Sequence, residues 1–282
     1  MTHELFKQKS KTLPQAHHRR ELLRLLALSA GAWGLTAPFT TPSAFAQGKD
    51  KPASKPLQQL RIGYQKSAVN LVILKQQGVL EKRFPTTKVS WIEFPAGPQL
   101  LEALSVGALE FGLTGDAPPV FAQAAGKDLY YVGAEPAKPE SSAVLVLQDS
   151  PIKSLVDLKG KKIALQKGSI AHYLLVRAIE KTGLQWTDIQ PIYLTPADAR
   201  AAFDRKSVDA WAIWDPFYAA TELALPTRVL TTGVGLSGNN SFYLSSTALA
   251  NQYPEMLLAL FEELSRADRF VQEHRPEAIK LI

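Results

Sequence analysis

The feature that most constrains the fold is a regular alternation of strand-like and helix-like segments from residue 60 onward. The helical segments begin at Asp, Thr or Pro and stop at Gly, as at Gly78 after 69–77 and at Gly107 after 98–106. The strand-like segments between them are short and apolar. This βαβα succession predicts mostly parallel sheets covered by helices and places the chain in the α/β class.

The alternation occurs in two runs, which predict two lobes. The first run ends near residue 133, an extended segment follows over 142–147, and the second run begins at 163. A further extended segment near 235–245 leads to a long amphipathic helix over 254–273. We therefore expect two crossing segments and a ligand cleft between the lobes. The predicted boundaries are lobe I over 60–145, lobe II over 146–238 and a return to lobe I over 239–282.

The first 46 residues have the three-part layout of an export signal. A basic start with Arg19-Arg20 precedes a weakly apolar stretch over 22–38, and Ala44-Phe45-Ala46 forms a small-x-small cleavage pattern. The apolar stretch is shorter than the roughly 20 residues that a membrane span needs. The paired arginines resemble a twin-arginine signal, and a general export signal that carries Arg-Arg is the alternative. We expect export to the periplasm, cleavage near Ala46 and a flexible linker over 47–59.

Composition removes several classes of function. Of 32 basic and 26 acidic residues, six basic and two acidic ones lie within residues 1–46, which leaves 26 and 24. This balance, without a basic run, argues against a nucleic-acid partner. The absence of cysteine excludes thiol catalysis and Cys-ligated metals. Only His172 and His274 follow the signal, and no phosphate-loop, dinucleotide or hydrolase motif is present. We expect no metal, no cofactor and no enzymatic activity.

Five strand-to-helix turns share the chemistry of an anion site. A helix start offers free backbone N–H groups and the positive end of the helix dipole, and glycine lets the backbone approach a ligand closely. Neutral Gln, Ser and Thr side chains add hydrogen-bond donors, which suit a fully ionised oxyanion such as a sulfonate. In α/β sheets ligands bind at the carboxyl ends of the strands, where these turns lie. The candidate ligand-binding residues are Gln65, Lys66, Ser67, Gly97, Pro98, Thr114, Gly115, Asp116, Gly168, Ser169, Trp214 and Asp215.

Several of these residues also have an ordinary structural explanation. Ser169 is a typical helix N-cap, which stabilises a helix by about 1 kcal/mol. Lys66 is typical of an exposed surface, and His172 of a neutral, partly exposed side chain in the first turn of a helix. Trp211 and Trp214 are three residues apart in a strand-like stretch and therefore face opposite sides. At most one of the two tryptophans lines the cleft.

The same turns carry a family resemblance. The segments FPAGPQ (94–99), TGDAPP (114–119) and AWAIWDP (210–216) are similar to those of the sulfonate/taurine/nitrate group of periplasmic binding proteins. DLKGKKIA (157–164) is shared more widely among type II binding proteins. The pattern from about residue 60 to the end most resembles the aliphatic sulfonate-binding proteins of bacterial ABC importers.

The resemblance implies a two-lobed periplasmic binding protein of type II. Such a protein captures an alkanesulfonate in the cleft and, as a monomer, delivers it to a permease with a cytoplasmic ATPase for sulfur supply. Asp116 and Asp215 would orient backbone rather than touch the anion. Receptors for taurine, nitrate or aromatic sulfonates, and an enzyme of the same fold, are the alternatives. Family members continue through further helices, so the helical pattern at 277–282 implies a chain truncated at its C-terminus.

Overall fold

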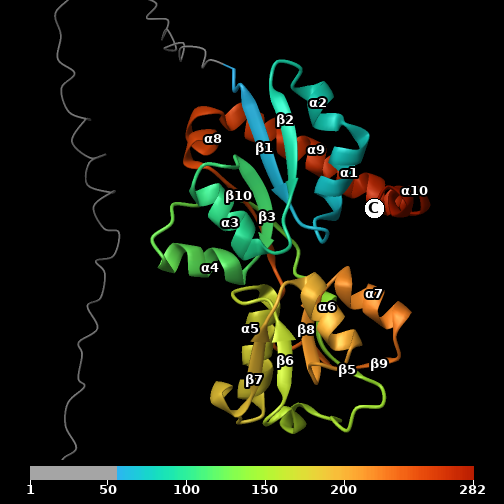
Figure 1. Ribbon diagram of the computed structural model, residues 1–282. Helices are drawn as coiled ribbons and strands as arrows, with labels where there is room; N and C mark the ends of the chain where they lie inside the picture. Colours follow the sequence, from blue (N-terminus) through green and yellow to red (C-terminus); the bar gives the residue numbers. More distant parts are fainter. Residues whose placement is uncertain (1–55) are drawn as a thin grey trace, which may run out of the picture. The chain divides into compact units, whose positions relative to one another are not determined.

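The computed structural model describes residues 56–282, which contain two five-stranded sheets (Figure 1). The first sheet combines strands from both ends of this part of the chain. Its strand order is β2-β1-β3-β10-β4. β1 pairs in parallel with β2 and β3, whereas β10 runs antiparallel to β3 and β4. The strands are β1 (Gln59–Tyr64), β2 (Lys88–Glu93), β3 (Phe111–Gly115), β4 (Tyr130–Glu135) and β10 (Ser241–Ser245).

The second sheet repeats this plan with strands from the middle of the chain. Its order is β7-β6-β8-β5-β9, with β6 parallel to β7 and β8, and β5 antiparallel to β8 and β9. The strands are β5 (Ser142–Leu147), β6 (Lys162–Leu165), β7 (Gln190–Tyr193), β8 (Ala210–Trp214) and β9 (Thr227–Thr232). In each sheet the antiparallel strand is the one that arrives from the other lobe. The predicted α/β class and two-lobed arrangement are therefore confirmed, and the sheets are mixed because of these inserted strands.

Helices accompany both sheets, and most begin and end where the sequence predicts. Gly78 ends α1 in the left-handed conformation, with φ +60°. Short helices such as α2 and α8 were not predicted, because five or six residues show too little periodicity. The helices are α1 (Val69–Gln77), α2 (Val79–Arg83), α3 (Gly97–Ser105), α4 (Ala117–Ala124), α5 (Ile170–Lys181), α6 (Pro196–Asp204), α7 (Phe217–Ala224), α8 (Thr247–Gln252), α9 (Pro254–Glu273) and α10 (Arg275–Leu281), with 3₁₀ turns at Pro139–Ser141, Leu155–Leu158 and Trp186–Asp188.

Each sheet has its own hydrophobic core. Ile62 and Phe111 are fully buried in the first core, where Leu260 of the long helix α9 packs against them. Phe203 and Trp211 are fully buried in the second core. Burial of such side chains stabilises the fold by about 1.5–3 kcal/mol each. Each lobe therefore has a hydrophobic core that stabilises it.

Two crossing segments, 136–141 and 233–240, connect the lobes and contact each other. The Gly233 N–H donates to the Pro139 carbonyl at 2.8 Å. A Cβ at Gly233 would lie 2.6 Å from the Pro139 carbonyl oxygen, so this approach requires glycine. The predicted lobe boundary after residue 145 falls inside β5, all of which pairs in the second sheet. We propose that lobe I ends before the first crossing and that lobe II begins at Ser142.

The predicted export signal, 1–46, and linker residues 47–55 lie outside the described part of the chain. The last residues of the predicted linker are already ordered, because Lys88 N–H donates to the Gln58 carbonyl at 2.9 Å and Gln59 begins β1. Within residues 56–282, no helix combines the length and the apolar character needed to cross a membrane.

Candidate functional site

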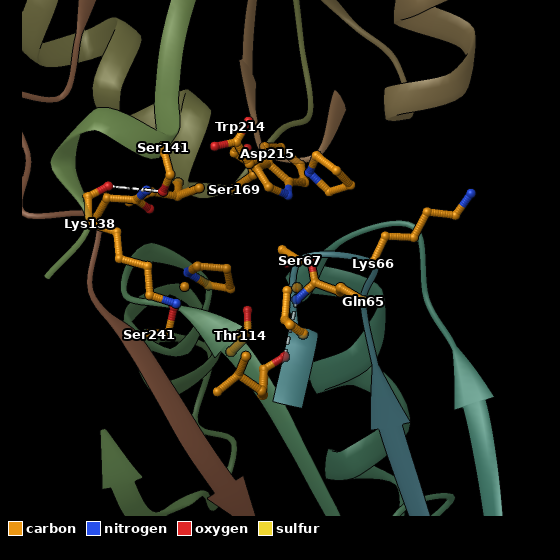
Figure 2. Close-up of a pocket in the computed structure, with 18 of the residues that line it drawn as sticks. Gln65, Lys66, Ser67, Thr114, Lys138, Ser141, Ser169, Trp214, Asp215 and Ser241 are labelled. Atoms are coloured by element: carbon orange, nitrogen blue, oxygen red, sulfur yellow. Dashed lines mark hydrogen bonds between the residues drawn. The ribbon is translucent and has the colours of Figure 1, made fainter. Parts of the chain in front are cut away.

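A pocket of about 250 Å³ lies between the two lobes, at the carboxyl ends of parallel strands from both sheets (Figure 2). The turns that follow β1, β2 and β3 form its lobe I wall, and those after β6 and β8 form its lobe II wall. This is the place at which ligands bind in open α/β sheets. The predicted residues that line the pocket are Gln65, Lys66, Ser67, Gly97, Thr114, Gly115, Ser169, Trp214 and Asp215.

Three predicted residues lie outside this pocket. Pro98 and Gly168 face each other across a neighbouring hollow, where a Cβ at Gly168 would lie 3.6 Å from Pro98 Cγ. Asp116 accepts hydrogen bonds from the backbone N–H and the side-chain amide of Asn240, each at 3.2 Å. It thus connects the start of α4 to the second crossing segment. We therefore remove Pro98, Asp116 and Gly168 from the set of residues that surround the pocket.

The lobe I wall presents a hydroxyl group that no other group uses. Thr114 is 1% exposed, and its Oγ1 has no hydrogen-bond partner within residues 56–282. A Cβ at Gly97 would lie only 1.9 Å from this oxygen, so glycine is required for the start of α3 to approach it. A free hydroxyl beside a helix start that carries free N–H groups is suited to an anionic oxygen. Gln65 supports this wall by donating from Nε2 to the Leu113 carbonyl at 3.1 Å.

The hydroxyl and the carboxylate side chains of the lobe II wall already make hydrogen bonds within that lobe. Ser169 Oγ donates to the Gln166 carbonyl at 2.7 Å and accepts the His172 N–H at 3.3 Å, which makes it the N-cap of α5. Asp215 Oδ1 accepts the Ala219 N–H at 3.1 Å in the first turn of α7. Burial raises the pKa of Asp215, while this hydrogen bond opposes the shift. Both side chains therefore stabilise local backbone.

The lobe II wall also supplies apolar surface. Trp214 is 6% exposed, lines the pocket and packs edge-on against Phe217 at 6.3 Å between ring centroids. Trp211, three residues earlier in β8, is fully buried in the core. The prediction that at most one of these tryptophans reaches the cleft is confirmed.

His172 is half-buried on α5, outside the pocket. Its Nδ1 accepts the Gly168 N–H at 3.1 Å, which requires an unprotonated nitrogen. Burial, and secondarily the nearby Lys167, lower its pKa. The expected neutral histidine is therefore confirmed. No group of three or more His, Asp or Glu side chains in the described part of the chain is arranged to hold a metal ion.

The sequence did not point to the residues that the crossing segments bring to the pocket. Lys138 and Ser141 come from the first crossing, and Asn239 and Ser241 come from the end of the second and the start of β10. No local motif marks them. The one available signal was the prediction that two segments cross between the lobes, since polar residues on such segments lie beside the cleft.

Two lysines line the pocket, and they point in different directions. Figure 2 shows the ammonium of Lys138 directed toward Thr114 and Ser241, whereas that of Lys66 extends away from them. Lys66 was predicted from its turn, and Lys138 was not. Of the two lysines, Lys138 is therefore the one whose ammonium is directed toward the free hydroxyl of the lobe I wall (Figure 2).

The profile of a known family, described as NMT1/THI5 like, matches residues 88–278. The chain belongs to the NMT1/THI5-like family. A curated relative from Escherichia coli K12, whose name describes an aliphatic sulfonates-binding protein, is 52% identical over 225 residues. That alignment covers 80% of this chain and 70% of the relative.

Two solved structures of family relatives have the same fold. The periplasmic aliphatic sulphonate binding protein SsuA from Escherichia coli matches with a TM-score of 0.71 and 53% identity, over 79% of this chain and 73% of that one. The alkanesulfonate-binding protein SsuA from Xanthomonas axonopodis pv. citri, bound to MOPS, matches with a TM-score of 0.76 and 50% identity. The match covers 81% of this chain and 79% of that one. The predicted periplasmic-binding-protein fold and the resemblance to sulfonate-binding proteins are confirmed, and these relatives are named as binding proteins rather than enzymes.

Proposed function

We propose that this protein is the substrate-binding component of an ABC importer for aliphatic sulfonates and binds the sulfonate in the pocket between its lobes. The observation that carries the proposal is the buried hydroxyl of Thr114 beside the start of α3, for which residues 56–282 offer no hydrogen-bond partner. The relatives described above, which share half of their aligned residues with this chain, support sulfonate as the anion.

The chemistry of the pocket suits a sulfonate with an apolar tail. A sulfonate is ionised at all physiological pH values and offers three acceptor oxygens, so neutral donors and one cation satisfy it without a proton transfer. Thr114, Gln65 and Ser67 supply the donors of the lobe I wall. The apolar part of the ligand would contact the apolar surface of the pocket, which includes Val69, Leu113, Pro118, Ile170 and Trp214.

The biological setting follows from this proposal. The protein would be exported by the signal in residues 1–46, cleaved near Ala46, and act in the periplasm as a monomer. The ligand would favour the closed arrangement of the lobes over the open one, and the closed form would deliver it to a permease with a cytoplasmic ATPase. The protein itself would carry out no chemical reaction.

The proposal is tested by a thermal-shift titration of the full chain. The ligands are ethanesulfonate, 1-butanesulfonate, taurine, nitrate and sulfate. A ligand that binds only the folded state stabilises it by about 2.7 kcal/mol at a hundredfold excess over its Kd, so alkanesulfonates should raise the Tm and sulfate should not. A shift only with nitrate or only with taurine would replace the proposed ligand. Release of sulfite from any sulfonate would contradict the non-enzymatic role.

A further inference from the structure

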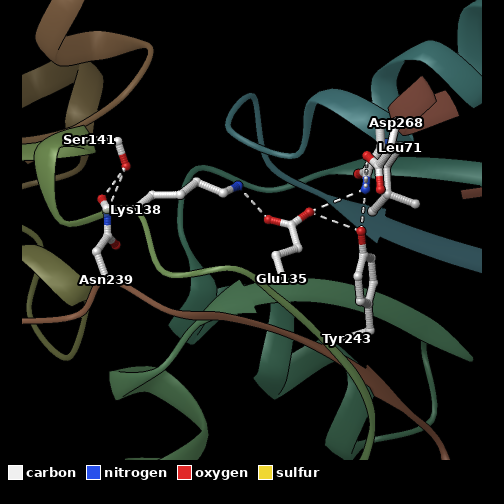
Figure 3. A network of polar contacts seen from close by, with 8 residues as sticks. Leu71, Glu135, Lys138, Ser141, Asn239, Tyr243 and Asp268 are labelled. Atoms are coloured by element: carbon white, nitrogen blue, oxygen red, sulfur yellow. Dashed lines mark hydrogen bonds and ion pairs between the residues drawn. The ribbon is translucent and has the colours of Figure 1, made fainter. Parts of the chain in front are cut away.

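Lys138 is the charged residue that the crossing segments bring to the pocket, and it forms an ion pair with Glu135 (Figure 3). Its Nζ donates to Glu135 Oε2 at 2.5 Å. Its backbone is fixed as well, since its N–H donates to the Gly238 carbonyl at 3.1 Å and its carbonyl accepts from Asn239 Nδ2 at 2.9 Å. The ammonium therefore extends into the pocket from a point where the two crossing segments hold each other.

Glu135 is anchored on its other side by neutral groups. Its Oε1 accepts from the Tyr243 hydroxyl at 2.9 Å and from Asn70 Nδ2 at 3.2 Å. Asn70 Nδ2 also lies 3.2 Å from Asp268 Oδ1 on α9. Asn70 and Tyr243 are nearly fully buried, and the Glu135 side chain is 11% exposed. This network fixes the carboxylate to lobe I, so the carboxylate cannot follow the ammonium of Lys138 into the pocket.

We propose that Lys138 makes the ionic contact to the anionic group of the ligand and that Glu135 weakens this contact, because it forms an ion pair with the same ammonium group. The inference rests on the proposed function of the pocket. An ammonium has three donors, so Lys138 can contact the ligand while one donor remains on Glu135. The anion nevertheless meets a cation that is partly neutralised by a carboxylate 2.5 Å away, and it is repelled by that carboxylate.

This arrangement sets both the specificity and the strength of binding. Lys138 selects ligands that carry a negative charge over neutral molecules of the same shape. Glu135 keeps the affinity below what an unpaired lysine would give, which favours release to a membrane partner. The two residues therefore have opposite effects on the binding of an anion, although they form one ion pair.

The inference is tested by isothermal titration of the full chain with 1-butanesulfonate and with neutral 1-butanesulfonamide. K138M should bind the sulfonate about tenfold to a hundredfold more weakly than the wild-type protein, because it loses a hydrogen bond to a charged group. K138R, which keeps the charge, should stay within about threefold of the wild-type protein. E135Q should bind the sulfonate about threefold or more tightly, because it removes the competing carboxylate. The affinity for the sulfonamide should change little in all three variants.

The matched control is K206M. Lys206 donates to Asp149 at 2.6 Å in an exposed ion pair of lobe II, so this variant loses the same charge outside the pocket and should bind like the wild-type protein.

Equal sulfonate affinity of K138M and the wild-type protein, or weaker binding by E135Q, would overturn the inference alone. A wild-type protein that binds no sulfonate would overturn the proposed function and this inference with it. If K138M fails to fold, as judged by its thermal transition, E135Q still decides the question, because the inference requires it to bind the sulfonate more tightly than the wild-type protein does.

Discussion

The two walls of the pocket are built alike and use their side chains differently. Both consist of helix starts at the carboxyl ends of parallel strands, and both carry a hydroxyl residue. In lobe I, the hydroxyl of Thr114 is buried and has no hydrogen-bond partner in the described part of the chain. In lobe II, the hydroxyl of Ser169 already makes two hydrogen bonds that cap α5. The hydroxyl group of one wall is thus left available for a ligand, whereas that of the other wall stabilises a helix.

This difference leads to the central claim of our account. We propose that the anionic group of the ligand is held by the lobe I wall together with Lys138, and that the lobe II wall covers the ligand with Trp214 and Ile170. The hydroxyl groups distinguish the two walls, since the Ser169 hydroxyl that caps a helix has little left to offer a ligand, whereas Thr114 Oγ1 has no partner within residues 56–282. Substitutions in the two walls should therefore separate binding from stability.

The largest effect is expected for Gly97→Ala in the lobe I wall. The new Cβ would lie 1.9 Å from Thr114 Oγ1 and 2.7 Å from Pro118 Cγ. Overpacking of this kind costs about 1–3 kcal/mol of unfolding free energy. The new methyl group would also occupy the space beside the free hydroxyl, so the affinity for 1-butanesulfonate should fall about a hundredfold or more. Chemical denaturation and isothermal titration measure the two effects.

Gly115→Ala is the companion variant. Its new Cβ would come no closer than 3.3 Å to its nearest neighbour, Ile170 Cβ, which a small shift can relieve. It should lose less stability and less affinity than Gly97→Ala. Equal losses in the two variants would show that the close approach of Gly97 to Thr114 has no special role.

The next largest effects distinguish the role of the Thr114 hydroxyl from that of the Ser169 hydroxyl. Thr114→Val removes a group without a partner, so the unfolding free energy should stay unchanged or rise by up to about 1 kcal/mol. Its affinity for the sulfonate should fall about tenfold, because a hydrogen bond to a charged group is lost. Ser169→Ala should show the reverse, with a loss of about 1 kcal/mol of stability and an affinity within about threefold of wild type. A larger loss of affinity in Ser169→Ala than in Thr114→Val would reverse the roles of the walls.

A smaller effect is expected from the carboxylate of the lobe II wall. Burial raises the pKa of Asp215 in the folded state, so the folded protein binds this proton more tightly than the unfolded chain does. The ionised carboxylate therefore lowers stability once the pH exceeds the unfolded value of about 3.9, and the loss is complete above the raised value.

Asp215→Asn should accordingly raise the unfolding free energy at neutral pH by less than about 1 kcal/mol, since solvent screens a half-exposed group. It should also tighten sulfonate binding about threefold by removing a like charge. Denaturation and titration at about pH 4 and pH 7 check this, because the difference from wild type should shrink at the lower pH. Weaker binding by Asp215→Asn would instead indicate that the carboxylate contacts a positively charged part of the ligand.

The smallest effect concerns His172 on α5. Burial lowers its pKa in the folded state, so its contribution to stability is fully present above the unfolded value of about 6.5 and is lost as the pH falls toward the lowered value. Between about pH 7 and pH 5, the unfolding free energy of the wild-type protein should fall by up to about 1 kcal/mol. The fall should be smaller for His172→Gln than for the wild-type protein. Urea denaturation at several pH values measures this difference. Identical pH profiles would show that the hydrogen bond from Gly168 does not depend on a neutral ring.

The sequence predicted the fold well because its signals are local. Gly78 and Gly107 stop helices at the predicted places, and the strand-like segments became strands of the two sheets. The insertion of β10 between β3 and β4 was not predicted, since nothing near residues 241–245 specifies which distant strand they pair with. Long-range pairing depends on the whole topology rather than on local propensity.

For the site, the sequence located the turns and could not give the directions of individual side chains. Thr114 and Asp116 lie in one turn, and one faces the pocket while the other holds Asn240. Lys66 was chosen for its place in a turn, although Lys138 carries its charge toward the pocket (Figure 2). The position of Lys138 depends on Glu135 and on the second crossing segment, about a hundred residues later in the chain, and no local pattern encodes such a contact.

The most direct test is a crystal structure of the protein with 1-butanesulfonate bound. We expect a sulfonate oxygen at a hydrogen-bonding distance of about 2.7–3.2 Å from both Thr114 Oγ1 and Lys138 Nζ, with the alkyl chain against Trp214. A sulfonate bound to Ser169 in the lobe II wall, with Thr114 Oγ1 still without a partner, would contradict the assignment of the anion to lobe I.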